Sequence, residues 1–590
     1  MTTVSSSSRF LIVSILAASF LTLLTNLEHT AIHYWDEGFH AMVARNLTQH
    51  PFLFTLYDQP WLPFDYKSWG NNYVWLHKPP LAMWKICISH WLLGFNTFAL
   101  RFPSAILATV AVWITYRIAR DLFTEKVGLI AAFMQGFNPF LFGSVHGYKY
   151  SDHIDISLLF WVEVSCWLLL KAIRTGRWQI YAYCGVAQGL AYLSKSYLAL
   201  ITFGVAGAVW LANRIHFLDL EKFSSAKEPP IRLKHLGIQL LASLLTIAPW
   251  TIYCLIRFPK EFLWEHKRVL DHLSTDVESW GATWDRPLFD YMILFYPVFY
   301  GVLLVAVLCL IWVMIKNRKL GEFFILAWAI GVIIPHSYAL TKTPSATIIG
   351  VPPLLICLAV VIGRALDSED WVYTSVWGAT LIAINTIKGG KSLVGGRDQF
   401  DTLNAFAPYI DTNFWIVQQI ALSLLVLPGI AVVYWLLSRR QWLKQIWFFA
   451  RTLAIVMSLF YVGGYMESAI HVTQVNQNDS YHKVIGELIR VKFPANACFF
   501  IDDARYGSHF FLMYYANRSV YQSRYTDSEK GVAEHDLDRL VKQSTATGAE
   551  PYLVGTMGRS YDYPVVAEGR VYDRAYTIYR LGKQQESGSD

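Results

Sequence analysis

Residues 98–120 read FALRFPSAILATVAVWITYRIAR, an apolar run that ends in Arg117 and Arg120. An α-helix needs about 20 residues to cross the roughly 30 Å of bilayer hydrocarbon, and this run is long enough. Basic residues at one end of such a run mark the edge of the membrane. The segment therefore predicts a transmembrane helix.

The same pattern recurs along the whole chain. Of its 590 residues 54% are hydrophobic and only 16% are charged, which is too apolar for a set of ordinary soluble domains. The sequence predicts a polytopic α-helical membrane protein of about thirteen spans. They are expected near residues 9–30, 98–120, 127–146, 152–172, 179–196, 198–214, 235–257, 288–315, 321–340, 345–364, 371–388, 413–437 and 446–466.

Lysine and arginine gather in alternate loops between these runs. The loops in question are 117–126, 171–177, 214–234, 316–319 and 439–444. The positive-inside rule makes that side cytoplasmic, together with the N-terminus, and an odd number of spans places the C-terminal tail outside. The net charge of +7 is thus a topology signal, not a nucleic-acid surface. A cleavable signal peptide is the alternative interpretation of the first run, Leu11 to Leu27.

The long, chemically mixed segments all fall on the outer side. They are 31–97, 258–287, 389–412 and the tail from about 467. We expect a transmembrane domain over 1–466, with a periplasmic first loop at 31–97 that forms helices along the bilayer surface. Residues 467–590 predict a small periplasmic α/β domain, with a helix at 481–492 and strands at 498–501, 551–556 and 577–581. The alternative for this domain is a lid or partner-binding module without catalytic residues.

Ionisable residues at the edges of membrane spans are costly and are therefore functional candidates. On the outer side Asp36 and Glu37 follow the first span directly. A partly desolvated carboxylate there can act as a general base toward a hydroxyl group. Neighbouring residues on a helix face different ways, so the two are not expected to share one role. The simpler alternative is a pair of solvated loop residues or a helix cap.

Four cations lie on separate outer segments: Lys78, Lys195, Arg268 and Lys342. Brought together they would form a phosphate-sized positive pocket. Each one alone could equally extend to the interface or pair with an acid.

A base beside a phosphate pocket at a bilayer surface suits one reaction in particular. The sugar of a polyprenyl-phosphate donor would be attacked at its anomeric carbon by an acceptor hydroxyl, and the lipid phosphate would leave. Cations that neutralise the phosphate can replace a general acid. A direct displacement of this kind inverts the anomeric centre and needs only one carboxylate.

Six strings carry a family resemblance: WDEGFHA at 35–41, HKPPLAMW at 77–84, ALRFPSA at 99–105, GLAYLSKS at 189–196, APW at 248–250 and LTKTP at 340–344. In order and spacing they resemble the C-type glycosyltransferases. The nearest relatives are the bacterial lipid A aminoarabinose transferases and the dolichyl-phosphate-mannose protein O-mannosyltransferases. The resemblance covers residues 10 to 466, and the tail is similar in placement and size.

The resemblance implies a transferase that uses polyprenyl-phosphate sugar donors at the outer face. By position, Asp36 would be the catalytic carboxylate. Lys78, Arg268 and Lys342 would hold the donor phosphate. Structural or pocket roles fall to Asp155 and Lys195, and the remaining candidates for substrate binding are Glu37, His40, His77 and His266.

This chain departs from the family pattern at three places. The aminoarabinose transferases commonly have Glu before Lys-Pro-Pro, where this chain has His77, and Tyr four residues after the Asp, where it has His40. Glu265-His266-Lys267-Arg268 is shorter than the relatives' E-H-x-x-R, which weakens the assignment of Arg268. Because two of these changes fall near the sugar, the donor sugar is left open.

The expected protein is thus a glycosyltransferase of the bacterial inner membrane that acts on a lipid A-like lipid or a glycan. A protein O-mannosyltransferase-like enzyme is the first alternative. A membrane transporter is the alternative of another class. A transporter would be expected to have ionisable residues near the middle of the membrane and an internal sequence repeat. No cofactor and no nucleic acid are expected. A divalent metal held by Asp36 with His40 or His77 is the rival use of those residues.

Overall fold

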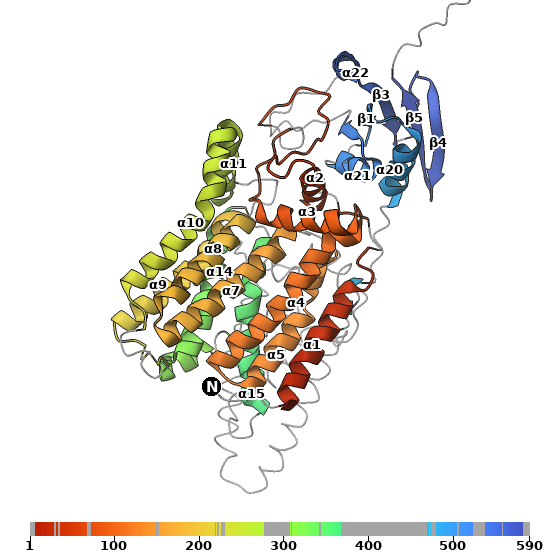
Figure 1. Cartoon of the computed structure of the whole chain (residues 1–590). Helices are drawn as coiled ribbons and strands as arrows, with labels where there is room; N and C mark the ends of the chain where they lie inside the picture. Colours follow the sequence, from red (N-terminus) through yellow and green to blue (C-terminus); the bar gives the residue numbers. More distant parts are fainter. Residues whose placement is uncertain are drawn as a thin grey trace, which may run out of the picture.

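The structure is a computed structural model of the whole chain. It describes residues 6–28, 31–33, 36–67, 72–147, 153–218, 230–275, 310–341, 344–366, 480–503, 507–522, 537–556 and 558–581, with a few single positions between these ranges. The described part consists of a helical bundle, an outer layer of short helices, and a sheet with three helices at the far end (Figure 1).

Apolar helices make up the bundle. They are α1 (Ser6–Leu24), α4 (Thr97–Leu122), α5 (Glu125–Gly136), α6 (Pro139–Val145), α7 (His153–Thr175), α8 (Trp178–Lys195), the 3₁₀ turn η1 (Ser196–Leu200), α9 (Ile201–Arg214), α10 (Leu233–Arg257), α14 (Leu320–Tyr338), the 3₁₀ turn η2 (Pro344–Gly350) and α15 (Val351–Leu366). Within the described residues six helical runs are long and apolar enough to cross a membrane, or seven if the bent pair α5 and α6 is one span.

The protein is therefore a helical membrane protein with several spans. The expected spans at 371–388, 413–437 and 446–466, and most of the one at 288–315, lie outside the described residues. The full count of thirteen stays a prediction. The residues expected as two spans at 179–196 and 198–214 form α8 and α9, which together make one of the six apolar runs, Trp178–Arg214. The turn η1 joins them and begins at Ser196, which has a left-handed φ of 59°.

Glycines bring two of the bundle helices into close contact. A Cβ added at Gly185 on α8 would lie 2.2 Å from the carbonyl oxygen of Gln239 on α10. At Gly189, one turn later, it would lie 2.6 Å from Cβ of Thr246. Without a hydrophobic driving force in lipid, small residues four apart allow helices to approach closely. Gly185 and Gly189 thus set the contact of α8 with α10.

Short helices form the outer layer: α2 (Asp36–Asn46), α3 (Leu81–Leu93) and α11 (Pro259–Ser274). The first two belong to the segment 31–97, in which helices were predicted. In Figure 1 α3 lies across the end of the bundle, while α11 continues beyond α10.

The tail contains α20 (Ser480–Lys492), β1 (Ala497–Ile501), α21 (Ser508–Ala516), β2 (Ser519–Gln522), α22 (Leu537–Ala546), β3 (Glu550–Gly555), β4 (Val565–Val571) and β5 (Arg574–Arg580). Its five strands are ordered β2-β1-β3-β5-β4. The first three run parallel to one another, and the last two pair antiparallel. The predicted helix at 481–492 and the three predicted strands are confirmed as α20, β1, β3 and β5. Sequence reasoning did not find α21, β2, α22 or β4.

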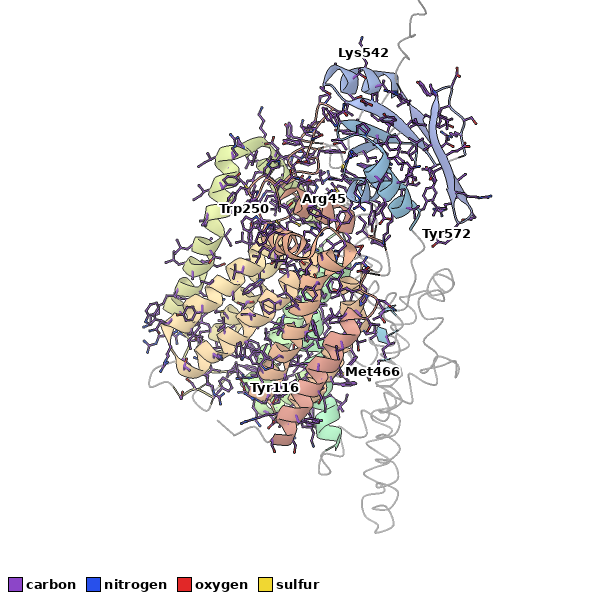
Figure 2. The ribbon with its side chains drawn as sticks, turned by 45° about the vertical axis from the view of Figure 1, so that its right-hand side comes forward. Arg45, Tyr116, Trp250, Met466, Lys542 and Tyr572 are labelled. Atoms are coloured by element: carbon purple, nitrogen blue, oxygen red, sulfur yellow. The ribbon has the colours of Figure 1, made fainter. Side chains whose placement is uncertain are left out.

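The first outer loop and the tail share one hydrophobic core. The rings of Tyr57 and Tyr521 stack at 4.8 Å between centroids, and those of Phe39 and Phe510 lie 4.4 Å apart. Arg45 of α2 donates hydrogen bonds to the carbonyl of Tyr514 and to the side chain of Asn517, and Figure 2 shows it where the outer helices meet the tail. The tail is therefore packed directly on the helix that begins at Asp36.

Candidate functional site

Asp36 is the first residue of α2, and its side chain is half-buried. Phe39 and His40 follow it by three and four residues, so all three lie on one face of the helix. That face meets Trp75, whose ring lies 5.8 Å from Phe39 and 5.8 Å from His40. The face of α2 that carries Asp36 is thus directed toward the segment before α3.

Trp75 connects this face to the predicted phosphate site. Its ring is also 5.8 Å from that of His77, the residue that precedes Lys78. Trp75 itself is completely buried. A single aromatic side chain therefore contacts both His40 on the helix of Asp36 and His77, the histidine beside Lys78.

His77 joins a second outer segment. Its Nδ1 lies 2.8 Å from Oε2 of Glu265 on α11, and both side chains are almost entirely buried. Arg268 follows Glu265 by one helical turn, with its guanidinium above the ring of Trp264. The segments that carry Lys78 and Arg268 are thereby held together through the neighbours of those two cations.

Burial raises the pKa of Glu265 to about 8, although the positive charges of Arg268 and Lys78 act to lower it. Both cations are therefore near enough to act on this carboxyl group. His266 points elsewhere, because its Nδ1 contacts the carbonyl oxygen of Phe262. Burial lowers the pKa of His266, so this imidazole is not a further positive charge at neutral pH.

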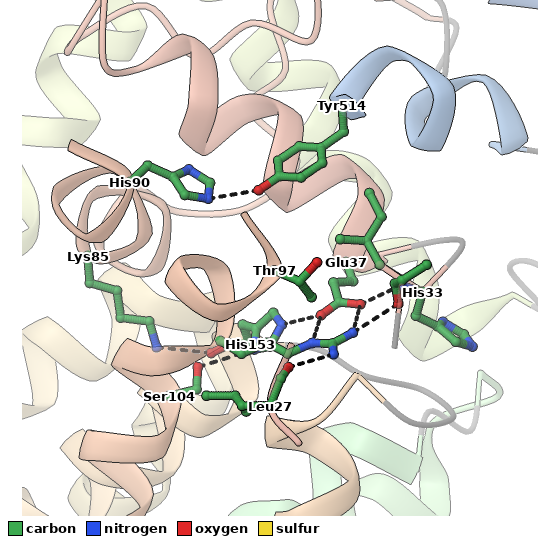
Figure 3. A network of polar contacts seen from close by, with 12 residues as sticks. Leu27, His33, Glu37, Lys85, His90, Thr97, Ser104, His153 and Tyr514 are labelled. Carbon is green, nitrogen blue, oxygen red and sulfur yellow. Dashed lines mark hydrogen bonds and ion pairs between the residues drawn. The ribbon is translucent and has the colours of Figure 1, made fainter. Parts of the chain in front are cut away.

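Glu37 lies inside the protein and not with Asp36. Its carboxylate accepts hydrogen bonds of 2.8 and 3.0 Å from Arg101 on α4, contacts Nε2 of His153 on α7 at 2.8 Å, and accepts a further bond from the backbone N–H of His33 (Figure 3). Burial raises the pKa of this group, but Arg101 and His153 outweigh burial and hold it below its usual range. Glu37 is an ionised anchor for the start of α2.

Ser104, His153 and Glu37 have the connectivity of a nucleophilic triad. Oγ of Ser104 lies 3.2 Å from Nδ1 of His153, whose other nitrogen meets Glu37. All three side chains are completely buried, and Arg101 binds the same carboxylate. A nucleophile must reach its substrate, so the arrangement is structural.

Asp155 and Lys195 form an ion pair with 2.6 Å between Nζ and Oδ1. Asp155 is buried near the start of α7, and Lys195 is the last residue of α8. The pair joins two spans at their outer ends. It brings together the two residues for which structural or pocket roles were expected.

Lys342 lies outside the described residues. Its neighbour Thr341 donates a 2.7 Å hydrogen bond to the carbonyl oxygen of Thr275, which caps α11. The chain just before Lys342 is thus attached to the end of the helix that carries Arg268.

An apolar cavity of about 700 Å³ lies between α9, α14 and the two 3₁₀ turns. Its lining includes Leu198, Ile201, Gly204, Met314, Phe323 and Ile330. The lining also includes Tyr197, two residues after Lys195, and His336 in the last turn of α14. Such a cavity can hold hydrocarbon beneath the outer layer.

Sequence reasoning missed Arg101, His153 and Gly147 as parts of this region. A Cβ at Gly147 would lie 2.4 Å from Arg101 and 2.6 Å from Glu37, and its φ of 69° also favours glycine. An arginine and a histidine near the ends of predicted spans were the available signal, because ionisable groups there require partners. Among the described residues no group of three or more His, Cys, Asp and Glu side chains could hold a metal.

Three comparisons relate this chain to known proteins. A model of the dolichyl-phosphate-mannose-protein mannosyltransferase family matches residues 77–226. The chain is 22% identical over 361 residues to undecaprenyl phosphate-alpha-4-amino-4-deoxy-L-arabinose arabinosyl transferase 1 of Pseudomonas fluorescens (strain Pf0-1). That match covers 58% of this chain and 59% of the relative.

Two solved structures are similar in fold. ArnT from Cupriavidus metallidurans bound to undecaprenyl phosphate has a TM-score of 0.63 at 17% identity, over 96% of this chain and 97% of that one. The archaeal oligosaccharyltransferase AglB from Archaeoglobus fulgidus, in complex with an inhibitory peptide and a dolichol-phosphate, has a TM-score of 0.55 at 12% identity, over 94% and 70%.

The protein therefore has the fold of these two solved structures, and the resemblance drawn from its sequence is confirmed. Its sequence is similar to the bacterial aminoarabinose transferases, at 22% identity to the Pseudomonas relative. The alignment spans just over half the length of that relative.

Proposed function

We propose that this protein is an inverting glycosyltransferase. It moves a sugar from a polyprenyl-phosphate donor to a hydroxyl or phosphate group of a lipid A-like lipid or a glycan, at the outer face of the bacterial inner membrane. The names of its relatives support the donor class, since an arabinosyl transferase and a mannosyltransferase family both match.

One observation carries the proposal: the face of α2 with Asp36 and the segments with Lys78 and Arg268 meet around Trp75 and the His77–Glu265 pair. In the proposed site the carboxylate of Asp36 and the cations Lys78 and Arg268 come from three separate elements, which these contacts join. The apolar cavity in the bundle supplies a place for a polyprenyl chain. Charge at one face above an apolar cavity suits an amphiphilic donor better than a transported solute.

In the proposed reaction the acceptor oxygen bonds to the anomeric carbon while the bond from that carbon to the phosphate oxygen breaks. The acceptor proton passes to the carboxylate of Asp36. The electron pair leaves with the phosphate, whose growing charge Lys78, Arg268 and Lys342 stabilise. The direction of attack is opposite to the leaving group, so the configuration inverts.

The proposed topology has about thirteen spans, with the N-terminus in the cytoplasm and residues 467–590 as an α/β domain in the periplasm. In support, the start of α1 and the sheet of the tail lie at opposite ends of the structure (Figure 1). Fusions to alkaline phosphatase after residue 590 would be active under this topology. An inactive enzyme at that position would contradict it.

The acceptor and the sugar are the open parts of the proposal. A protein O-mannosyltransferase-like activity is the second candidate, since the mannosyltransferase family model matches residues 77–226. Mass spectrometry of lipids and protein glycans from a strain without this chain would separate the two. A missing sugar on a lipid favours the first candidate, and one missing from Ser or Thr of proteins favours the second.

The base assignment is tested with Asp36→Asn. We expect sugar transfer from a polyprenyl-phosphate sugar to membrane extract to fall by about 10²- to 10⁴-fold, the usual contribution of a general base. Donor binding and membrane insertion should be unchanged. Asp58→Asn is the matched control, because Asp58 lies in the same outer segment, is partly exposed, and forms its described ion pair with the half-exposed His50. Retained turnover in Asp36→Asn would reject the assignment.

A further inference from the structure

Two pairs of a tryptophan and a cation lie side by side near the ends of α4 and α7. Trp113 and Arg117 are one turn apart on α4, and Trp167 and Lys171 are one turn apart on α7. The two tryptophan rings meet at 5.4 Å between centroids, with an angle of 73° between their planes. Two neighbouring spans thus present the same pattern at the same place.

Both cations are stacked on these rings. The guanidinium carbon of Arg117 lies 5.2 Å from the ring centre of Trp113 and 5.3 Å from that of Trp167. Nζ of Lys171 lies 3.4 Å from the ring centre of Trp167. Cations are attracted to the faces of aromatic rings, and to tryptophan most strongly. The rings therefore hold two like charges next to each other in defined positions.

These two charges have no counter-charge in the part of the chain that the structure describes. Nε of Arg117 is buried there without a hydrogen-bond partner. Neither Arg117 nor Lys171 forms an ion pair with another described residue. Both side chains are half-buried, so water screens them only in part. An anion placed between the two cations would relieve their repulsion, and a phosphate suits both side chains.

The acidic residues nearby are already bound to other groups. Asp121 attracts both cations, but its carboxylate accepts hydrogen bonds of 3.2 and 2.9 Å from Arg120. Glu163 on α7 accepts hydrogen bonds from Gln135 and Thr115 inside the bundle. The anion that pairs with the two cations is therefore expected from outside the described protein.

The surface next to the cations is apolar. Residues three and four apart share one face of a helix, so each cation ends a stripe along its span. The residues of these stripes are partly exposed: Ile106, Val110 and Trp113 before Arg117 on α4, and Phe160, Val164 and Trp167 before Lys171 on α7. A free phosphate would match the cations alone. A lipid with a phosphate headgroup matches the cations and the stripes together.

We propose that Arg117, Lys171 and their two tryptophans form a binding site for an anionic phospholipid. The phosphate lies between the two cations, and the acyl chains lie along the stripes of α4 and α7. Basic residues between spans on the cytoplasmic side are suited to such lipids. Tyr116, the neighbour of Arg117, lies at the opposite end of the bundle from Arg45 (Figure 2). In the proposed topology the lipid thus belongs to the inner leaflet, away from the site of sugar transfer.

The test is native mass spectrometry of the full-length protein in detergent, titrated with dioleoylphosphatidylglycerol. Dioleoylphosphatidylcholine, which has no net charge, is the reference lipid. Wild-type protein should bind the anionic lipid at least about ten-fold more tightly than the reference. Arg117→Gln and Lys171→Gln should each weaken binding of the anionic lipid about five-fold, and the double variant should lose the preference.

Lys316→Gln is the matched control. Nζ of Lys316 also lies over a tryptophan one turn before it, Trp312, at 5.3 Å, but both side chains are exposed. This variant loses the same charge and should bind the anionic lipid as wild type does. Arg117→Lys keeps a charge at the site and should retain affinity within about three-fold. Gel filtration checks that each variant is folded, and Lys171→Gln decides the test if Arg117→Gln is not.

Three results would overturn the inference. The first is a wild-type protein that binds both lipids equally, or a double variant that keeps the preference. The second is an equal loss in Lys316→Gln, which would mean a general attraction to positive charge. The third is displacement of the lipid by excess inorganic phosphate, which would mean that the site binds phosphate without its chains. Because sugar transfer is not measured, none of these results changes the assignment of Asp36.

Discussion

Glu37 and Glu265 are both buried at the outer end of the bundle, and their surroundings are opposite. Glu37 receives two bonds from Arg101, a contact from His153 and a backbone N–H, so its pKa is held below the usual range. Among the described residues Glu265 has one hydrogen-bonding partner, His77, and burial raises the pKa of Glu265 to about 8. A buried carboxylate with several hydrogen-bond donors stays ionised and stabilises the fold. A buried carboxyl group with few donors tends to keep its proton.

The largest expected effect on stability comes from Glu37, the carboxylate with all its partners in place. Glu37→Gln leaves Arg101 buried without its counter-charge, and breaking a buried ion pair costs about 3–5 kcal/mol. We expect a strongly lowered melting temperature of the purified protein in detergent, with Glu265→Gln as the matched control that melts no lower than wild type. Equal melting temperatures for the two variants would remove the contrast between these sites.

Lowering the pH should also destabilise the protein through Glu37. The pKa of Glu37 is lower in the folded than in the unfolded protein, so its stabilisation is complete above about pH 4.5 and is lost as the pH falls toward the folded value. Melting curves of wild type between pH 7 and pH 3 should show this loss. In Glu37→Gln that part of the acid dependence should be absent.

The next effect comes from Gly147, which packs against both Arg101 and Glu37. Gly147→Ala combines a left-handed φ with a clash against the ion pair, and we expect a loss of about 3 kcal/mol. Gly548→Ala is the control, because its φ is 88° but nothing lies within 4 Å of the added Cβ. It should lose only about 1 kcal/mol. Similar melting temperatures of Gly147→Ala and Gly548→Ala would mean that Arg101 and Glu37 can move to make room for the added methyl group.

A substitution of Tyr515, which contacts the chain just before α2 and Glu37, should lower stability by less. Its hydroxyl accepts a 3.1 Å bond from the N–H of Ile32, just before α2, and lies 3.4 Å from Oγ1 of Thr97. Tyr515→Phe should lower stability by about 1–2 kcal/mol, because it leaves a buried N–H unpaired. Tyr572→Phe, at an exposed tyrosine, should melt as wild type does. If both variants melt alike, this contact does not hold the tail to α2.

The smallest change in stability is expected from Glu265→Gln below about pH 4.5, where the wild-type carboxyl is protonated in both the folded and the unfolded protein and the difference should be below about 1 kcal/mol. Its signature is the pH dependence. Because the pKa of Glu265 rises on folding from 4.5 to about 8, the wild-type fold binds the extra proton and loses stability as the pH rises between those values. Glu265→Gln should remove this slope, which is opposite in sign to that of Glu37. A slope that persists in the variant would assign it to another group.

Local patterns accounted for the elements that the sequence predicted. Long apolar runs predicted α4, α7 and α10, and a segment of helical spacing predicted α20. By contrast, α21 is buried at all nine positions, so its sequence shows no amphipathic period. The sequence of β4 begins with two exposed valines, so it likewise shows no alternation of apolar and polar residues.

The candidate site was predictable only in part, for a related reason. Charge and position in the sequence singled out Asp36, Lys78 and Arg268. The partners of Glu37 are 64 and 116 residues away, and the contact of His77 with Glu265 spans 188 residues. No local pattern encodes such pairings, and they decide which carboxyl is an anchor and which holds a proton.

The core shared by the first loop and the tail has a consequence for biogenesis. Ile32 and Tyr515 are 483 residues apart, so the loop leaves the ribosome long before its packing partner exists. Under the proposed topology, Phe39 and Tyr57 must remain uncovered on the outer side of the membrane while the rest of the bundle is inserted. Nascent chains at this stage are natural clients for extracytoplasmic chaperones, and a stop codon before α21 would leave the segment permanently exposed to proteases.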